Sequence, residues 1–430
     1  MKFYFLRPKA LPTFLCLLLL TLVTIGARAQ PAAGAKWWKG NLHTHTLWSD
    51  GDDYPEMVVG WYQEHGYNFL AITDHNRMLT GEHWINTTNR GGGEALQKYL
   101  ARHGTNWVAQ RTTNDIPQVR LKTLEEFRPL FESPGRFLLI PGEEISARYK
   151  SAPIHLNAIN LREVIPPQEG SSIAEVLQNN INAVLAQRRR TGEPMFPHIN
   201  HPNFRWALRA EDMVALQGDR FFEVFNGHSS VNNYGDRTHV STERIWDIIL
   251  TRRAVELGLE PIWGTAVDDS HAYHEFGVGK TNPGRGWVMV RAAELTPAAI
   301  IEAMERGDFY ASSGVRLKDV QRGPKAIRIE ILSEPGVTYT TQFIGSRRGC
   351  DLKSEPVRDE QGRELPVTRR YSDEIGMVLA EVKGDNATYK LTGDEIYVRA
   401  KVISSKAKAN PYAAGDFETA WVQPLVTGVE

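Results

Sequence analysis

Cysteines and long hydrophobic runs are scarce in this sequence of 430 residues, which has two cysteines and one extended hydrophobic run near its N-terminus. Cys16 belongs to that run, so Cys350 is alone in the rest of the chain and has no partner for an internal disulfide. A hydrophobic core must therefore supply the stability. Any metal site must be built from nitrogen and oxygen ligands, because thiolates are not available in sufficient number.

An excess of charge of one sign is also missing, since 50 basic side chains stand against 51 acidic ones. This balance gives no positive field of the kind that nucleic acids or anionic membranes attract, and the one basic run, Arg188 to Arg190, is short. We expect no nucleic-acid partner. With 41% hydrophobic and 23% charged residues, the composition excludes a disordered, collagen-like or coiled-coil chain and leaves room for two or three globular domains.

The N-terminus has the pattern of a secretory signal peptide over residues 1–29. Its basic residues, hydrophobic stretch and small residues are Lys2, Arg7 and Lys9, residues 11–25, and Ala27-Arg28-Ala29. A membrane anchor is the alternative, but the stretch is short, contains Pro12 and ends in a cleavage pattern. We therefore predict a mature chain that begins near Gln30, without a stable membrane anchor, in the periplasm or outside the cell.

From about residue 37 to residue 291, short apolar runs alternate with amphipathic helical patterns. The expected strands are residues 40–43, 69–73, 137–141, 154–160, 195–199, 221–225, 262–267 and 287–290, and the clearest helices are residues 55–65, 173–188 and 241–257. Such alternation predicts an α/β fold of βα units around a parallel sheet or barrel.

Two segments depart from this alternation. Residues 76–133 are too long for a barrel loop, and we interpret them as an insertion over one face. After residue 316 the apolar side chains of Ile327, Ile329 and Ile331 alternate with polar ones, a period that is typical of antiparallel strands. We therefore predict a metal-binding barrel domain over residues 30–316 and a small antiparallel β domain over residues 317–430, for which a scaffolding role is the default.

Histidines and carboxylates gather at or just beyond the ends of the expected strands. They are His43, His45, Asp50, Asp74, His75, Glu143, Glu144, His155, His198, His201, Asp269 and His271. In a barrel of βα units the carboxyl ends of the strands meet at one rim. We therefore expect many of these side chains to converge, which isolated core histidines would not do.

Spacing refines this expectation, because side chains two residues apart in a strand point to the same face. His43 and His45 are then expected to converge on one ion, and the side chains of Asp269 and His271 are expected to point to the same face. Asp268 faces the opposite way and becomes a supporting or core residue. Between Glu143 and Glu144 the sequence does not decide which one points inward.

Imidazole and carboxylate ligands without thiolate suit Zn, Mn or Fe. The candidates are too many for one ion, so two or three divalent metal ions that share a bridging carboxylate are expected. Bridged ions lower the pKa of bound water toward neutrality and hold the attacking and leaving oxygens of an ester. The pattern indicates a metal-dependent hydrolase.

Five motifs in this order resemble the PHP superfamily, named for polymerase and histidinol phosphatase. They are NLHTHTLWSDG at residues 41–51, ITDH at residues 72–75, PGEE at residues 141–144, His201-Pro202, and Asp269-Ser270-His271. The resemblance covers about residues 37–314, and GDFYASSG at residues 307–314 is similar to exported members related to carbaryl hydrolase. It implies a distorted barrel of seven βα units with a trinuclear metal centre.

The resemblance also implies which residues bind each ion. The first metal would take His43, His45, Glu144 and Asp269, the second Glu144, His155 and His201, and the third Asp50, His75 and His271. All nine family positions are filled, and His155 is placed by order alone. These nine residues are the predicted catalytic and metal-binding set.

The leading functional hypothesis is an exported phosphoesterase that hydrolyses a small phosphate mono- or diester through a metal-bound hydroxide. Arg285, Lys280 and His228 are the candidates for binding this small-molecule ester. One alternative is hydrolysis of a carboxylic ester or carbamate at the same site, for which a cationic phosphate pocket is not needed. Another is a non-catalytic periplasmic protein that binds metal or glycan. The sequence leaves the metal identity and the oligomeric state open.

Overall fold

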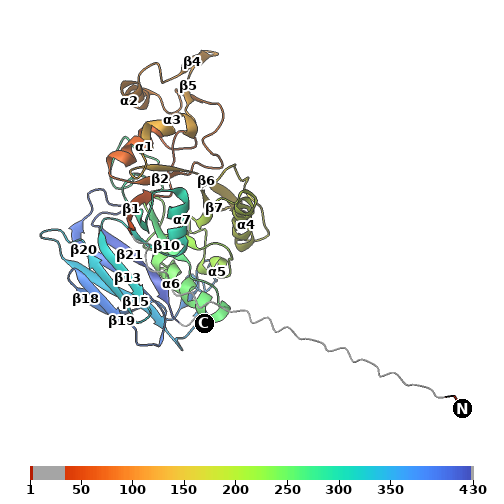
Figure 1. Ribbon diagram of the computed structural model, residues 1–430, viewed down its shortest axis with the longest axis vertical. Helices are drawn as coiled ribbons and strands as arrows, with labels where there is room; N and C mark the ends of the chain where they lie inside the picture. The colour runs from red at the N-terminus through yellow and green to blue at the C-terminus, as the bar shows by residue number, and fades with distance from the viewer. Residues whose placement is uncertain (3–33, 428–430) are drawn as a thin grey trace. The chain divides into compact units, whose positions relative to one another are not determined.

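Residues 34–427 fold around one large mixed sheet in the computed structural model, which describes residues 1–2 and 34–427 (Figure 1). The expected signal peptide therefore lies almost wholly outside the described residues. Within the described part of the chain, no helix combines the length and the hydrophobicity that crossing a membrane requires.

The strands of the large sheet follow the order β10-β9-β8-β7-β6-β2-β1-β11-β12-β21-β20-β15-β18. Their bounds in chain order are β1 (Lys36–Asn41), β2 (Phe69–Ile72), β6 (Leu138–Tyr149), β7 (Ala152–Ile159), β8 (Phe196–Ile199), β9 (Phe221–Asn226), β10 (Trp263–Val267), β11 (Trp287–Ala292), β12 (Phe309–Ser312), β15 (Tyr339–Arg347), β18 (Met377–Lys383), β20 (Glu395–Ala407) and β21 (Phe417–Val426). Each of the eight strands expected before residue 291 is confirmed, with shifts of a few residues at most ends, but β6 continues eight residues beyond its expected end at residue 141.

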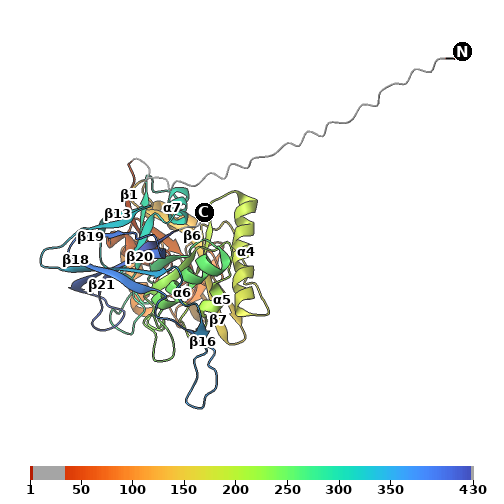
Figure 2. The ribbon, with the colours of Figure 1, turned by 90° about the horizontal axis from the view of Figure 1, so that it is seen from below.

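The helices are α1 (Pro55–Glu64), α2 (Gly93–His103), α3 (Leu124–Phe131), α4 (Ile173–Thr191), α5 (Ala210–Met213), α6 (Thr242–Arg252) and α7 (Pro297–Glu305), and a π-helical turn, η1 (Arg253–Leu257), extends α6. Figure 2 shows α4, α5 and α6 near one another beside the sheet. Apolar residues such as Leu177 and Ile181 of α4 and Trp246 of α6 are buried in one cluster with residues of the strands. The helices thus cover the outer face of strands β6 to β10.

Among β1, β2 and β6 to β10, only β7 departs from a parallel arrangement, whereas β11 on the other side of β1 is antiparallel to it. Pairs β1–β2, β2–β6, β8–β9 and β9–β10 are parallel, whereas β7 is antiparallel to both β6 and β8. Only Lys150 and Ser151 separate β6 from β7, and Lys150 has a φ of 54°. Two residues can close a hairpin but cannot make the long crossover that parallel strands need. The β6–β7 unit is therefore a hairpin within the sheet.

A closed barrel is not confirmed, because the sheet is open from β10 to β18. The strand ends nevertheless meet where β1 and β10 finish. Thr44 and Ser270 form an isolated parallel bridge, and the backbone N–H of Asp269 donates to the carbonyl of His43 at 3.0 Å. This contact brings the segments after β1 and β10 together at the rim where the predicted ligands lie.

The insertion over residues 76–133 has its own secondary structure. Strands β3 (His83–Asn86), β4 (Gln110–Thr113) and β5 (Ile116–Leu121) form a small antiparallel sheet, which is accompanied by α2 and α3. The insertion is attached to α1 through Glu56, whose carboxylate accepts hydrogen bonds from Tyr99 at 2.6 Å and Trp107 at 2.7 Å. It is a packed unit and not an irregular loop.

After residue 316 the strands are antiparallel, as the alternating pattern predicts. Besides the strands already given, they are β13 (Leu317–Gly323), β14 (Ala326–Ile331), β16 (Ser354–Glu355), β17 (Arg370–Tyr371) and β19 (Asn386–Lys390). β12 pairs with β21, so the C-terminal strands continue the main sheet without a break. The division into two domains near residue 316 stays a prediction.

Strand β20 departs from simple alternation because both of its faces are buried. Tyr397 and Arg399, which alternate with the apolar residues, point toward Asp247 of α6. The Arg399 guanidinium donates to both carboxylate oxygens of Asp247 at 2.7 Å, and the Tyr397 hydroxyl donates at 2.6 Å. This buried ion pair joins the C-terminal strands to the helical layer.

We predict that Asp247→Ala lowers the free energy of unfolding by about 3–5 kcal/mol, because the buried Arg399 guanidinium loses its two hydrogen bonds to a carboxylate and retains only the charge of Glu243, 3.6 Å away. Urea denaturation of the metal-free protein measures this. Asp394→Ala is the control, because Asp394 pairs with Arg347 on the exposed surface at 2.5 Å and should cost less than about 1 kcal/mol. Equal losses for the two variants would contradict the structural role of the buried pair.

Candidate metal centre

The nine predicted ligands come together at one rim of the main sheet. They form four overlapping groups, each with its ligand atoms within 4.8 Å of one another: His45, Asp50, His75 and His271; His43, His45 and Glu144; His43, His201 and Asp269; and His75, Glu144 and His155. The segments after β1, β2, β8 and β10 supply seven of them, while Glu144 of β6 and His155 of β7 lie diagonally across the hairpin and are in contact at 3.0 Å. Strand ends that meet in space explain why residues far apart in sequence converge.

The deepest part of the cluster contains two imidazole nitrogens that lack a hydrogen bond. His43 Nε2 is 3.3 Å from Asp269 Oδ1 and 3.5 Å from Glu144 Oε1, and His45 Nε2 is 3.2 Å from Asp269 Oδ1 and 3.4 Å from Glu144 Oε2. Both nitrogens are buried and make no hydrogen bond in the described part of the chain. Unsatisfied buried polar atoms are costly.

A divalent cation among these atoms would remove that cost. Zinc binds imidazole nitrogen and carboxylate oxygen at about 2.0–2.2 Å, which places neighbouring ligand atoms roughly 3–3.5 Å apart. The distances between the imidazole nitrogens of His43 and His45 and the carboxylates of Glu144 and Asp269 lie in that range. The residues present therefore fit a metal ion of the kind that the donor set predicts.

The outer part of the cluster is formed around Asp50. His271 Nε2 lies 3.3 Å from Asp50 Oδ1, and His75 Nε2 lies 3.5 Å from Asp50 Oδ2. The Asp50 side chain is 55% exposed, whereas those of Glu144 and Asp269 are 1% and 5% exposed. The cluster is thus closed at its base and open to solvent at Asp50.

Glu144 is the inward-facing member of the Glu143-Glu144 pair. Its Oε1 is 3.0 Å from His155 Nδ1 and 3.2 Å from His201 Nε2, and Oε2 is 2.7 Å from His75 Nδ1. Glu143 instead accepts a hydrogen bond from the backbone N–H of Ile165 at 2.6 Å. The sequence predicts His155 as a ligand from its order along the chain alone, and its contact with Glu144 agrees with this prediction.

Ionisation in the cluster follows from burial and mutual charge. Burial raises the pKa of Glu144, but the charges of His75, His155 and His43 outweigh it and hold this pKa well below its usual value. Burial lowers the pKa of His45 to about 3, together with repulsion by His271 and His75. Burial also acts against the charged form of four other histidines, but nearby carboxylates outweigh it and raise their pKa, namely that of His43, His75, His201 and His271. A carboxylate and a neutral imidazole are the protonation states that bind metal ions.

Glu223 supports the cluster and was not among the predicted site residues. Its carboxylate lies 2.7 Å from His43 Nδ1 and accepts hydrogen bonds from the backbone of His201 at 2.6 Å and from Asn226 Nδ2 at 2.7 Å. Asn226 also donates to Asp269 Oδ2 at 3.0 Å. A lone carboxylate among the apolar residues 221–225 of strand β9, which is buried throughout, is the sequence signal that could have revealed Glu223.

Two further aspartates act on the backbone around the ligands. Asp74 accepts hydrogen bonds from Thr46 and Ser49 and so holds the loop between His45 and Asp50. Asp268 points away from the cluster, as the spacing predicts, and accepts from Tyr62 and from the backbone N–H groups of residues 284–286. His198 lies 2.6 Å from Thr265 Oγ1 in the core, and within the described residues it has no hydrogen bond or ion pair with the nine predicted ligands.

Arg285 and Lys280 make no polar contact with the nine ligands in the described part of the chain. The Arg285 guanidinium donates to the carbonyls of Gly227, Gly277 and Lys280. Lys280 pairs with Glu275 at 2.5 Å on the surface. The structure therefore gives Arg285 a structural task, and the substrate contacts predicted for both residues gain no support from it.

His228 and Phe204 lie beside the ligands. The His228 ring is 5.2 Å from the ring of His271, and the half-buried Phe204 ring is 5.0 Å from His201 and 5.9 Å from His228. The backbone N–H of Ser230 donates to His228 Nδ1 at 3.1 Å, so Nε2 carries the ring proton. Burial lowers the pKa of His228 to about 4, which keeps the ring neutral at pH 7.

No protein-family profile matches the sequence, and no curated protein matches it significantly. Among solved structures, the chain is similar to a two-domain protein of Bacteroides vulgatus that contains a predicted PHP-like metal-dependent phosphoesterase, with 14% identity, 92% of this chain and 97% of that chain covered, and a TM-score of 0.40. It is also similar to an amidohydrolase of Chromobacterium violaceum, with 12% identity, 55% and 88% covered, and a TM-score of 0.30. A proposed metal-dependent phosphoesterase of Bifidobacterium adolescentis matches with 15% identity, 59% and 91% covered, and a TM-score of 0.28.

We predict that Glu223→Gln weakens metal binding by about 10- to 100-fold, because it removes the charge that orients His43 and raises its basicity. Competition with a chelator measures the affinity. Glu143→Gln is the matched control, since Glu143 is also a buried carboxylate. It accepts a hydrogen bond from the Ile165 backbone and, among the described residues, has no hydrogen bond or ion pair with a predicted ligand. A similar loss in both variants would contradict a specific role for Glu223.

Proposed function

We propose that this chain is a metal-dependent hydrolase that cleaves a small phosphate mono- or diester. The observation that carries the proposal is the pair of buried Nε2 atoms, on His43 and His45, that face carboxylate oxygens of Glu144 and Asp269 without hydrogen bonds. Such an arrangement is stable when a cation lies among the four groups. Sites with a complete set of imidazole and carboxylate ligands, open to solvent on one side, are typical of hydrolytic metal centres.

We propose that the nine ligands hold two or three divalent ions, Zn, Mn or Fe. His43, His45, Glu144 and Asp269 would bind one ion at the base, and Asp50, His75 and His271 would bind one at the exposed edge. His155 and His201 would bind a further ion together with Glu144. When bound, the ions would activate water and neutralise charge on the ester. The burial of Glu144 and Asp269 keeps competing water away from the base of the site.

The chain's own residues would orient these groups and the ester. Glu223 fixes the His43 ring through Nδ1, and Asn226 fixes Asp269 through Oδ2. The ester would enter at the exposed Asp50 edge, and the His228 Nε2–H would donate to one of its oxygens. Phe204 would offer an apolar surface to the rest of the substrate.

A second candidate is hydrolysis of a carboxylic ester or carbamate at the same centre. This candidate is favoured because Arg285 and Lys280, the cationic side chains predicted to bind a phosphate, have other partners. Arg285 donates to backbone carbonyls and Lys280 pairs with Glu275, so within the described residues neither makes a polar contact with the metal ligands, where a phosphate would bind. The phosphoester stays the first choice, because two or three divalent ions can neutralise a phosphate without an arginine.

The wider setting is also part of the proposal. We propose that residues 1–29 are a cleaved signal peptide, that the mature protein is periplasmic or secreted, and that residues 30–316 form a PHP-type barrel followed by a β domain over residues 317–430. The bridge between Thr44 and Ser270, which joins the segments after β1 and β10, supports the closing of seven strands, β1, β2 and β6 to β10, into such a barrel.

We predict that Asp269→Asn, which keeps the size of the side chain and removes its charge, lowers turnover at least about a hundredfold. Loss of a residue that only supports a ligand lowers activity up to about a hundredfold, so loss of a ligand should lower it at least as much. The assay compares nitrophenyl phosphate, bis-nitrophenyl phosphate and nitrophenyl acetate after loading with Mn or Zn. Turnover of the acetate alone would support the second candidate. Metal binding without turnover of any ester would refute both hydrolase proposals and leave a metal or glycan binding protein.

We predict that His228→Phe lowers kcat/KM about tenfold, the value of one neutral hydrogen bond, while His228→Gln retains most of the activity because its amide still donates. Metal content should be unchanged in both variants, which inductively coupled plasma mass spectrometry checks. Equal losses in the two variants, or loss of metal, would show that His228 acts by packing or as a ligand and not as a donor to the substrate.

A further inference from the structure

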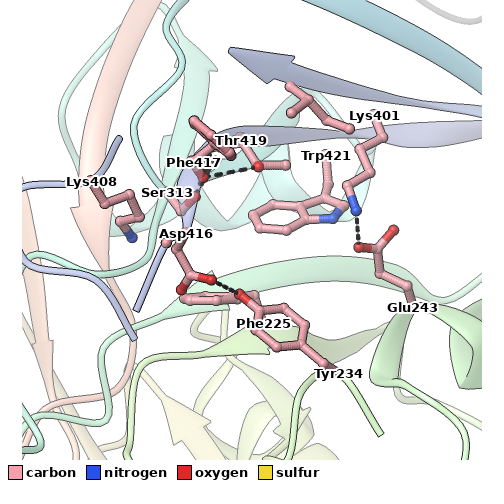
Figure 3. A pocket seen from close by; sticks show the side chains of 12 residues that line it. Phe225, Tyr234, Glu243, Ser313, Lys401, Lys408, Asp416, Phe417, Thr419 and Trp421 are labelled. Carbon is pink, nitrogen blue, oxygen red and sulfur yellow. Dashed lines mark hydrogen bonds and ion pairs between the residues drawn. The ribbon is translucent and has the colours of Figure 1, made fainter. Parts of the chain in front are cut away.

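A cavity of about 230 Å³ lies between the main sheet, the loop after β9 and the loop between β20 and β21 (Figure 3). Its lining includes Phe225, Tyr234, Lys408, Asp416, Phe417 and Trp421. None of the nine predicted metal ligands lines it. The cavity is therefore a candidate site separate from the metal centre.

Four aromatic residues line the cavity, beside polar and charged ones. Phe225 and Trp421 are buried, and their rings stack at 5.5 Å. Tyr234 and Phe417 are 57% and 51% exposed, which is unusual for large rings. Exposed aromatic side chains around a cavity indicate a binding surface, because they lose unfavourable contact with water when a ligand covers them.

The acidic groups of the cavity already have partners. Glu243 pairs with Lys401 at 2.6 Å. Asp416 accepts hydrogen bonds from the Tyr234 hydroxyl at 2.8 Å, drawn in Figure 3, and from the backbone N–H of Ala413 at 2.9 Å. A ligand therefore gains little by bringing a cation to these carboxylates.

The Lys408 ammonium has hydrogen-bond donors without partners among the described residues. Its ammonium has three N–H donors, yet in the described part of the chain it makes one hydrogen bond, to the Arg285 carbonyl, and no ion pair. Nζ lies 5.3 Å from the centre of the Phe225 ring. Burial lowers the pKa of Lys408 to about 8, so the side chain is mainly charged at pH 7 but is poorly solvated. Two donors are left for a ligand.

We propose that this cavity binds a small monocarboxylate with a flat ring, whose carboxylate bonds the Lys408 ammonium and whose ring lies against the aromatic walls. A cavity of about 150 Å³ admits benzene, so a ring with one carboxyl group fits the volume here. The charges of Asp268, Asp416 and Glu418 act on Lys408 as well. They would repel a dianion, and this disfavours a phosphate monoester in the same place.

Calorimetric titration of the full protein with benzoate, benzyl alcohol and phenyl phosphate tests the proposal. Benzoate should bind most tightly, and Lys408→Gln should weaken it at least about tenfold, the loss that corresponds to 1.4 kcal/mol, while leaving benzyl alcohol nearly unchanged. Lys406→Gln is the matched control. Lys406 lies two residues earlier, pairs with Glu334 and Glu418, and does not line the cavity.

The structural contact of Lys408 with Arg285 calls for a second variant that does not disturb it. Phe417→Ala removes a ring of the lining that is 51% exposed and carries no hydrogen-bonding group, so it should weaken benzoate and benzyl alcohol alike, with a nearly unchanged melting temperature. Three results would overturn the proposal: no binding of benzoate to the wild-type protein at millimolar concentration, equal loss in Lys408→Gln and Lys406→Gln, or loss of benzoate binding in Asp269→Asn, which would place the carboxylate at the metal centre.

Discussion

The burial of one carboxylate, that of Glu144, is the constraint on which the candidate site depends. Its two oxygens lie near five imidazoles, those of His43, His45, His75, His155 and His201. A buried anion is tolerated only with compensating charge or hydrogen bonds, and Asn200 adds one at 2.8 Å. The strands that carry these histidines must therefore end where Glu144 lies. The hairpin that turns β7 back on β6 meets this requirement, because it sets His155 beside Glu144.

Much of this arrangement could be predicted from the sequence because its signals are local. The strands before residue 291 are short apolar runs with clear limits. The two-residue period of a strand predicts that His43 pairs with His45 and Asp269 with His271, but these residues lie in the segments just beyond β1 and β10, where the bridge between Thr44 and Ser270 holds them together. Asp268 was expected to face away from the ligands, and its hydrogen bonds to Tyr62 and residues 284–286 confirm this. Local periodicity determines which side a residue faces, and the ends of the strands determine which residues meet.

The remaining features depend on contacts between distant segments, which local patterns do not contain. The choice of Glu144 over Glu143 depends on the twist and pairing of β6. The reversed direction of β7 depends on a two-residue turn, and the burial of Arg399 depends on Asp247, which is 152 residues away. Arg285 illustrates the same limit. Its position after a ligand strand suggested an anion contact, whereas its guanidinium is used to hold the backbone of three loop residues.

The pairing of strands that are far apart in sequence also bears on how the protein acquires its metal. β1 pairs with β11, with Lys36 opposite Ala292, and the ligands extend from His43 to His271. During synthesis the ribosome releases the chain from its N-terminus, so His43 and His45 appear long before Asp269 and His271 are available. The pocket at the base cannot exist in a partly synthesised or unfolded chain. A chain exported before folding would therefore take its ions from the compartment in which it folds, and the metal supply of that compartment would select which ions the site contains.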